Sequence, residues 1–184
     1  HKWDLPGGTV SPKTVAEMAG ISNAVAIKHS PGDLAHTLQT LKLCGKQILV
    51  SDPFEAHWIP AMESGMECIL GNCIVHLWQT EKVHPLFDYV QAAMRGDFQQ
   101  AWEIYWSLQP MRDLWWSVHA EPFHMGLHPF SHWKYWEGLV GMTGGPLRQV
   151  APLVHHEVRE QSKALWQHYG ILSGDIAYQD AVIR

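Results

Sequence analysis

Residues 24–30, with the sequence AVAIKHS, predict a short buried strand that carries a single lysine near its C-terminal end. In a strand, Lys28 shares one face with Ala24 and Ala26, and the residues between them point the other way. Because small neighbours in a tight interior leave no room for water, we expect desolvation to lower the pKa of Lys28. A neutral amine of this kind forms Schiff bases with carbonyl substrates. The alternative is an ordinary lysine whose stem lies along the rim of a sheet.

The composition is typical of a globular protein with a well-filled core. The chain has 184 residues, of which 46% are hydrophobic and 17% are charged, which favours one domain with an appendage. The net charge of -5 and the lack of a basic block exclude a nucleic-acid-binding surface. Since no apolar run reaches the ~18 residues of a membrane span and no signal peptide is visible, we expect a soluble, cytoplasmic protein without a membrane partner.

The first residue and the cysteines indicate whether a segment precedes this sequence and in which redox compartment the protein lies. The chain opens on His1 rather than methionine, which leaves room for an upstream segment. Cys44, Cys68 and Cys73 form no CxxC pair and are odd in number. This pattern favours reduced thiols in a reducing compartment.

The first 71 residues alternate predicted helices with predicted strands. Each helix begins at a capping residue, and the predicted N-caps are Ser11, Asp33 and Asp52, the last followed by Pro53 and by Glu55 at the N3 position. The predicted helices are 12–19, 34–44 and a segment that starts at 53. The predicted strands are 24–30, 47–51 and 66–71. Strands joined by single helices predict βαβ units and a parallel sheet.

Beyond Asn72 the pattern predicts helices only. The expected helices are 85–95, one from 98 toward Trp116 with a kink at Pro110, one around 133–136, and 153–169. Loops are expected over 121–129 and 141–146, and the last dozen residues predict a tail.

Ten tryptophans are present, and six of them lie between residues 100 and 140. Their helical spacing favours a helical core or a subunit interface. The alternative is an aromatic wall for a flat apolar substrate. The six are Trp102, Trp106, Trp115, Trp116, Trp133 and Trp136.

The 13 histidines raise the question of a metal site. His124, His128 and His132 have i, i+4, i+8 spacing, but Pro122 and Pro129 interrupt any single helix that would align them. The run His155-His156-Glu157 differs from the HExxH zinc pattern. Surface or interface histidines explain these residues better, so we expect no metal site.

Nearly the whole chain is covered by an ordered series of short motifs. They are SPKTV (11–15), VAIK (25–28), SPGDL (30–34), LVSD (49–52), GMECI (65–69), RGDF (95–98) and GGPLR (144–148). In order and spacing, the series resembles the second half of the dihydrodipicolinate synthase and N-acetylneuraminate lyase family. Members of that family are class I, pyruvate-handling (β/α)8 TIM barrels with a helical C-terminal extension.

The resemblance implies an α/β fold that corresponds to about strands 6–8 of the barrel. Residues 1–95 would form a partial barrel, 96–172 the helical C-terminal extension and 173–184 a tail. Strands one to five, with the threonine-rich loop that holds the pyruvate carboxylate and the tyrosine that relays protons, have no match here. The 184 residues therefore look like the back half of an enzyme, with the front half cleaved or supplied by another chain.

The resemblance also implies a catalytic site. Lys28 matches the strand-six lysine that forms an imine with the keto acid, so no metal or organic cofactor is expected. Ile69 matches the apolar residue beside bound pyruvate, Gly71 offers nearby backbone, and Ser51 falls at the mouth of strand seven; these three are the expected substrate-binding residues. His29 follows Lys28 where many members carry an acidic or aromatic residue.

The implied function is that of a Schiff-base-forming lyase or aldolase acting on pyruvate or 2-oxo acid adducts. Residues 2–6, with the sequence KWDLP, look like a segment of the hydratase-aldolase branch, which cleaves aromatic benzylidenepyruvates. One alternative is a synthase-like condensation of pyruvate with an aldehyde, and another is a non-catalytic fragment that serves assembly. As in the family, we expect a small-molecule 2-oxo acid as ligand and a homo-oligomer, dimer or tetramer, as the assembly.

Overall fold

The computed structural model of the chain describes residues 9–71, 74–125, 127–144, 147–148, 153–173 and 182–183. It divides into two compact units. The first unit comprises His1–Asn72 and Tyr89–Trp102, and the second comprises Cys73–Asp88 and Glu103–Arg184. The architecture is α/β with helices predominating, and the described residues contain few strands, all of them short.

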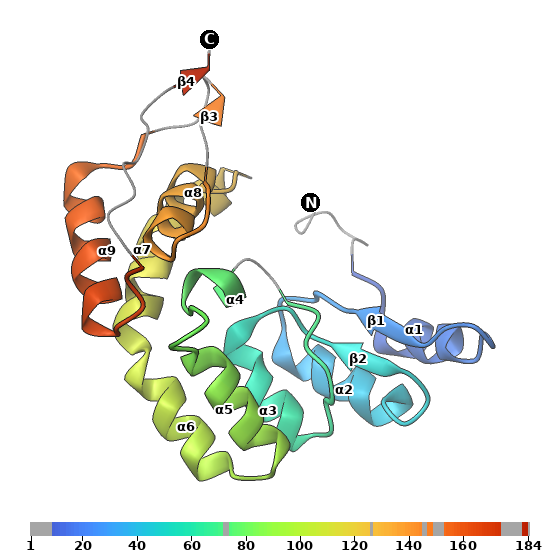
Figure 1. Ribbon diagram of the computed structural model, residues 1–184. Helices are drawn as coiled ribbons and strands as arrows, with labels where there is room; N and C mark the ends of the chain where they lie inside the picture. Colours follow the sequence, from blue (N-terminus) through green and yellow to red (C-terminus); the bar gives the residue numbers. More distant parts are fainter. Residues whose placement is uncertain are drawn as a thin grey trace. The chain divides into compact units, whose positions relative to one another are not determined.

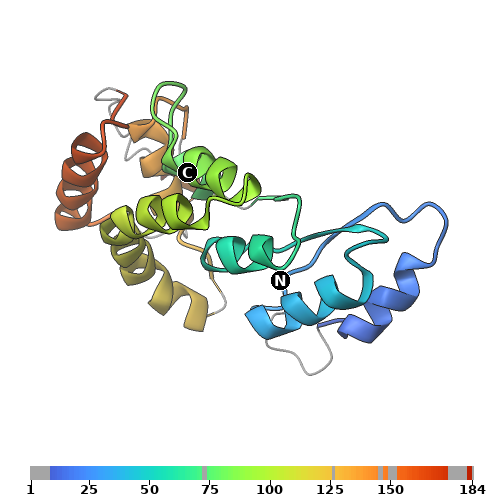
Figure 2. The same cartoon turned by 90° about the horizontal axis from the view of Figure 1, so that it is seen from below.

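The first unit holds a two-stranded parallel sheet and its helices. Strand β1 pairs with β2 in parallel, so that Ala26 lies opposite Leu49 and Lys28 lies opposite Ser51. Helices α1 and α2 pack against each other (Figures 1 and 2). This arrangement confirms the predicted β-α-β order. The elements are α1 (Pro12–Ala19), β1 (Ala26–Lys28), α2 (Leu34–Cys44), β2 (Leu49–Ser51), the 3-10 helix η1 (Glu55–His57) and α3 (Trp58–Glu63).

Local capping explains where the first two helices begin. The side chain of Ser11 accepts the Thr14 N–H at 3.1 Å, and Pro12 fills the first turn of α1. The Asp33 carboxylate accepts the Ala35 N–H at 3.0 Å at the start of α2. Both predicted N-caps are therefore confirmed.

Two predictions for this unit are wrong. No strand forms over residues 66–71, although the segment lies beside β2 through the hydrogen bond from Leu70 N to Ser51 Oγ. Asp52 does not start a helix either. Its carboxylate accepts the Phe54 N–H at 2.8 Å in a local turn, and the chain becomes helical only at Glu55. A short polar side chain that satisfies its own backbone in this way competes with helix formation.

The described residues of the second unit are helical apart from one small strand pair and the loops between helices. Strand β3 pairs in parallel with β4, which lies in the segment predicted as a tail. Helices α5 and α6 have residues in both units. The elements are α4 (Ile74–Leu77), α5 (Pro85–Met94), α6 (Phe98–Ser107), α7 (Gln109–His124), α8 (Phe130–Leu139), β3 (Leu147–Arg148), α9 (His156–His168) and β4 (Val182–Ile183).

Pro110 and Pro122 do not act as the sequence predicts. The helix expected from 98 to Trp116 is two helices, and Pro110 lies in the first turn of α7, where its missing N–H costs nothing. Helix α7 continues through Pro122 to His124, across a segment predicted as a loop. Helix α9 begins at His156 rather than at residue 153.

Tryptophans fill the core of the second unit. Trp78, Trp136 and Trp166 are fully buried. The indole N–H of Trp136 donates to Ser162 Oγ at 2.8 Å, and that of Trp166 donates to the Leu77 carbonyl at 3.0 Å. These bonds satisfy the indole N–H groups of Trp136 and Trp166 inside the core, whereas the buried Nε1 of Trp78 has no hydrogen-bond partner among the described residues.

The six tryptophans between residues 100 and 140 divide between core and surface. Trp115 and Trp136 lie in the core, as predicted, whereas Trp106 and Trp116 are more than half exposed. None of the helices in the described ranges combines the length and the apolar character needed to cross a lipid bilayer.

Candidate active site

Three of the four predicted site residues meet at the carboxyl ends of β1 and β2. Lys28 is the last residue of β1 and Ser51 the last of β2, and they are direct partners in the parallel register. Lys28 Nζ donates to the Gly71 carbonyl at 2.7 Å. The Leu70 N–H donates to Ser51 Oγ at 2.6 Å, which brings Gly71 to this end of the sheet. Such an edge is where α/β proteins place their reactive groups.

Ile69, the fourth predicted residue, lies on the same segment as Gly71. It is partly buried. The resemblance gave it a place beside bound pyruvate, and that role stays a prediction.

Lys28 is exposed, which corrects the expectation of a dry interior. Ala26 is also exposed and Ala24 is only partly buried, so the small face of the strand is not covered. In the described part of the chain, β1 pairs with β2 alone. Desolvation requires protein atoms on every side of an amine, and the described residues supply them on one side, where Gly71 lies.

The buried His29 points toward helix α2 and pairs there with the partly buried His36. Their Nε2 and Nδ1 atoms are 2.8 Å apart, and the rings stack with centroids 4.8 Å apart. Burial, followed by repulsion from His36, lowers the pKa of His29, and the charge of Asp52 opposes this shift. The neutral form of His29, the residue that follows Lys28 at the end of β1, is therefore favoured.

Asp52 is the centre of a network that the sequence did not reveal. Its carboxylate is fully buried. It accepts hydrogen bonds from Thr37 Oγ at 2.6 Å, from Phe54 N at 2.8 Å and from His57 Nδ1 at 2.8 Å. The sequence predicts Asp52 as an N-cap with Glu55 at the N3 position. Instead, Glu55 binds the Tyr89 hydroxyl at 2.9 Å.

Replacing Asp52 with alanine is expected to lower the free energy of unfolding by about 3–5 kcal/mol, because one buried and two partly buried donors lose their acceptor together. The measurement is urea unfolding of both proteins. Asp97→Ala is the matched control, since Asp97 is an exposed helix cap that accepts the Gln100 N–H. Loss of such a cap is expected to lower the free energy of unfolding by only about 1 kcal/mol. Equal losses in the two variants would contradict the network.

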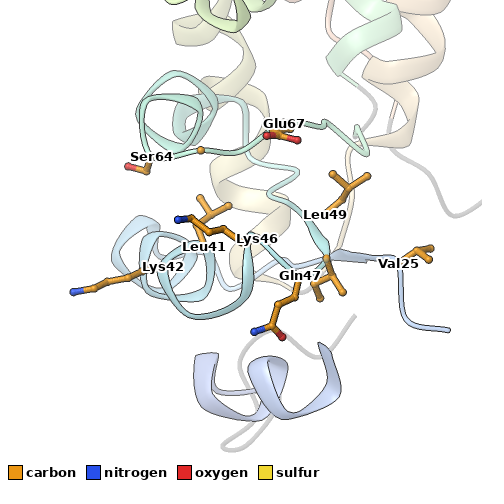
Figure 3. A pocket seen from close by; sticks show the side chains of 11 residues that line it. Val25, Leu41, Lys42, Lys46, Gln47, Leu49, Ser64 and Glu67 are labelled. Atoms are coloured by element: carbon orange, nitrogen blue, oxygen red, sulfur yellow. The ribbon is translucent and has the colours of Figure 1, made fainter. Parts of the chain in front are cut away.

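A cavity of about 740 Å³ lies at the opposite end of the sheet. Val25 and Leu49, at the amino ends of the two strands, line it together with Lys46 and Glu67. Figure 3 shows Ser64 and Glu67 on one segment of its wall, and Leu41, Lys42, Lys46 and Gln47 on another. Because none of the predicted site residues lines this cavity, it is separate from the Lys28 site.

In the described ranges, no three His, Cys, Asp or Glu side chains gather closely enough to hold a metal ion. His124 ends α7, His132 lies in α8, and His128 lies between the two helices. Sequence reasoning missed His119, which is buried in the second unit among Trp115, Trp133 and Trp136. Of the free cysteines, Cys44 is buried and Cys68 partly buried, while Cys73 lies outside the described residues.

Comparison with known proteins gives one consistent result. Residues 3–129 match the dihydrodipicolinate synthetase family. A 4-hydroxy-tetrahydrodipicolinate synthase from Methanospirillum hungatei is 23% identical over 172 residues, which are 91% of this chain and 54% of that protein. A protein of the same name from Psychrobacter arcticus is 30% identical over 132 residues, which are 68% of this chain and 42% of that protein.

Solved structures show the same fold. The dihydrodipicolinate synthase of Aquifex aeolicus superposes with a TM-score of 0.66 at 20% identity, over 88% of this chain and 51% of that one. YagE from E. coli K12, solved in complex with pyruvate, gives a TM-score of 0.64 at 18% identity, again over 88% and 51%. The chain thus spans about half or less of the length of the relatives it matches.

Proposed function

This chain belongs to the dihydrodipicolinate synthetase family, and from that premise we propose that it carries the imine-forming lysine of a class I, pyruvate-dependent carbon–carbon lyase or synthase. The observation that supports this best is the position of Lys28. Its Nζ lies at the carboxyl end of a parallel strand, 2.7 Å from the Gly71 carbonyl and opposite Ser51. In our proposal β1, β2 and residues 66–71 are strands six, seven and eight of a barrel.

The chemistry requires the lone pair of the Lys28 amine. Its nitrogen lone pair attacks the ketone carbon of pyruvate, and loss of water from the carbinolamine gives a protonated imine. Removal of a proton from the methyl carbon moves the electron pair into an enamine, which attacks an aldehyde and forms a carbon–carbon bond. Water then releases the product and restores the amine, and the reverse sequence cleaves the bond.

The matched part of this chain covers only about half the length of the relatives, so the activity of a whole enzyme is part of the proposal. The family resemblance assigns carboxylate binding and proton relay to segments that the 184 residues do not match. We therefore expect the chain alone to form the imine only at high pyruvate concentration.

The test is reduction of the purified chain with borohydride in the presence of pyruvate. The expected result is a mass increase of one reduced pyruvate, located by peptide mapping on Lys28. Omission of pyruvate is the control. An adduct spread evenly over the exposed lysines, or no adduct at all, would contradict the proposal and favour a non-catalytic assembly module.

Two reactions compete within this proposal. The relatives are named 4-hydroxy-tetrahydrodipicolinate synthases, which favours the synthase-like condensation of pyruvate with an aldehyde. The resemblance of residues 2–6 favours hydratase-aldolase cleavage of aromatic adducts, but these residues lie outside the described ranges. The buried tryptophans form the core of the second unit, so they do not support an aromatic substrate. Pyruvate consumption with aspartate semialdehyde, an aromatic aldehyde and a sugar distinguishes the options.

A further inference from the structure

We infer that Ser51 is a positioning residue for Lys28, holding residues 70–71 against β2 so that the Gly71 carbonyl meets the lysine amine. The inference rests on the proposed function. It gives Ser51 a role that does not require contact with the substrate.

Ser51 joins the two segments that meet at the amine. Its backbone carbonyl accepts the His29 N–H at 2.7 Å, which fixes the end of β1 next to Lys28. Its side-chain oxygen accepts the Leu70 N–H at 2.6 Å, which fixes the residue before Gly71. A single residue therefore sets the distance between the lysine and its carbonyl partner.

The hydroxyl takes the place of a strand ladder. Among the described residues, no backbone hydrogen bond joins 67–71 to β2, and the segment is not a strand. Ser51 Oγ supplies the contact that a ladder would otherwise give. The Ser51 side chain is fully buried, so the Leu70 N–H would be left without this acceptor if the hydroxyl were removed.

The carbonyl of Gly71 fixes the direction of the amine. Its hydrogen bond with Nζ, 2.7 Å long, holds a side chain that is otherwise exposed and free to rotate. A nucleophile displaced by about 1 Å can lose on the order of a hundredfold in rate. We therefore expect Ser51→Ala to slow imine formation by roughly tenfold to a hundredfold, through the maximal rate rather than through the pyruvate concentration at half-maximal rate.

The experiment measures borohydride trapping at Lys28 over a range of pyruvate concentrations, in the wild type, Ser51→Ala and Ser51→Cys. Cysteine has a side chain of similar size whose sulfur is a weaker hydrogen-bond acceptor than the serine oxygen. Ser51→Cys therefore replaces Ser51→Ala in the experiment if the alanine variant does not fold. Ser162→Ala is the matched control. Ser162 is an equally buried serine that accepts an N–H, that of Trp136, in the other unit.

A second measurement does not depend on pyruvate. Formaldehyde and cyanoborohydride methylate lysines, and mass spectrometry compares Lys28 with the exposed Lys46. We expect the Lys28 to Lys46 ratio to rise in the Ser51 variants, because the amine loses its carbonyl partner, and to stay constant in Ser162→Ala. An unchanged ratio, or equal slowing of trapping in Ser51→Ala and Ser162→Ala, overturns the inference. If borohydride traps no pyruvate on the wild type, but the Lys28 to Lys46 methylation ratio still changes in the Ser51 variants, the proposed function is overturned and the positioning role remains supported.

Discussion

Lys28→Ala is expected to reduce the pyruvate adduct trapped by borohydride to background. The imine requires a primary amine, and no other side chain at the carboxyl ends of β1 and β2 provides one in the described residues. Lys28→Arg is expected to lose the adduct as well, because a guanidinium group stays protonated and is not nucleophilic. Intact-mass spectrometry after reduction measures both variants.

Lys46→Ala is the matched control for these variants. Lys46 is also an exposed lysine of the first unit, but it lines the cavity at the opposite end of the sheet. Its loss is expected to leave the adduct at the wild-type level. If Lys28→Ala were labelled as fully as the wild type, Lys28 would have no part in the chemistry.

The second unit is expected to lose stability steeply in mild acid. His119 is fully buried and stacks on Trp115 with ring centroids 3.7 Å apart. Its Nδ1–H donates to the Trp115 carbonyl at 2.7 Å, and its Nε2 accepts the indole N–H of Trp133 at 2.7 Å. Both nitrogens are therefore used by the neutral ring, and a proton on Nε2 would break the second bond.

Burial is the main cause of low pKa values at two histidines of this unit. It lowers the pKa of His119 to about 3, aided by repulsion from His132 and His128 and opposed by the hydrogen bond to Trp115. It also lowers the pKa of His132 to about 4, with a further contribution from His155. Since both groups titrate near 6.5 in the unfolded chain, the unfolded state binds more protons below that pH.

Stability is therefore complete above pH 6.5 and falls as the pH drops toward the folded-state values. Each histidine contributes a slope of at most about 1.4 kcal/mol per pH unit. Together they are expected to remove about 3–4 kcal/mol of the free energy of unfolding between pH 7 and pH 5. This is a large part of the roughly 5–15 kcal/mol that stabilises a typical domain.

Urea unfolding between pH 5 and pH 8, followed by tryptophan fluorescence, measures this loss. His132→Gln is expected to reduce the pH slope by nearly half. His84→Gln, at an exposed histidine that pairs with Asp88 at 2.9 Å in the same unit, is the control and should leave most of the slope. A stability that does not change over this range would contradict the neutral, buried His119.

Features set by local sequence were predictable. Ser11 and Asp33 cap their helices through bonds to residues two or three positions away, so the signal and its effect lie in one short stretch. The parallel pairing of β1 with β2 also followed from the alternation of helices and strands. The position of Lys28 next to Gly71 and Ser51 came from the family resemblance, and the structure brings these residues together.

Features set by distant residues were not predictable. The burial of Lys28 depends on what surrounds β1, which residues 24–30 do not specify. Asp52 resembled a helix cap, but its partner Thr37 lies 15 residues away and sets its role. Pro122 resembled a helix breaker, yet α7 continues through it. His119 gave no signal, because its partner Trp133 lies 14 positions away on another helix.

The single pairing of β1 has a consequence for how the chain behaves at high concentration. In the described residues β1 has one bonded neighbour, and an open strand edge invites association with another polypeptide. A charged lysine on such a strand discourages this association. The Lys28 side chain would therefore help to keep the chain dispersed, and Lys28→Arg, which retains the positive charge, is expected to stay unassociated up to a higher protein concentration than Lys28→Ala.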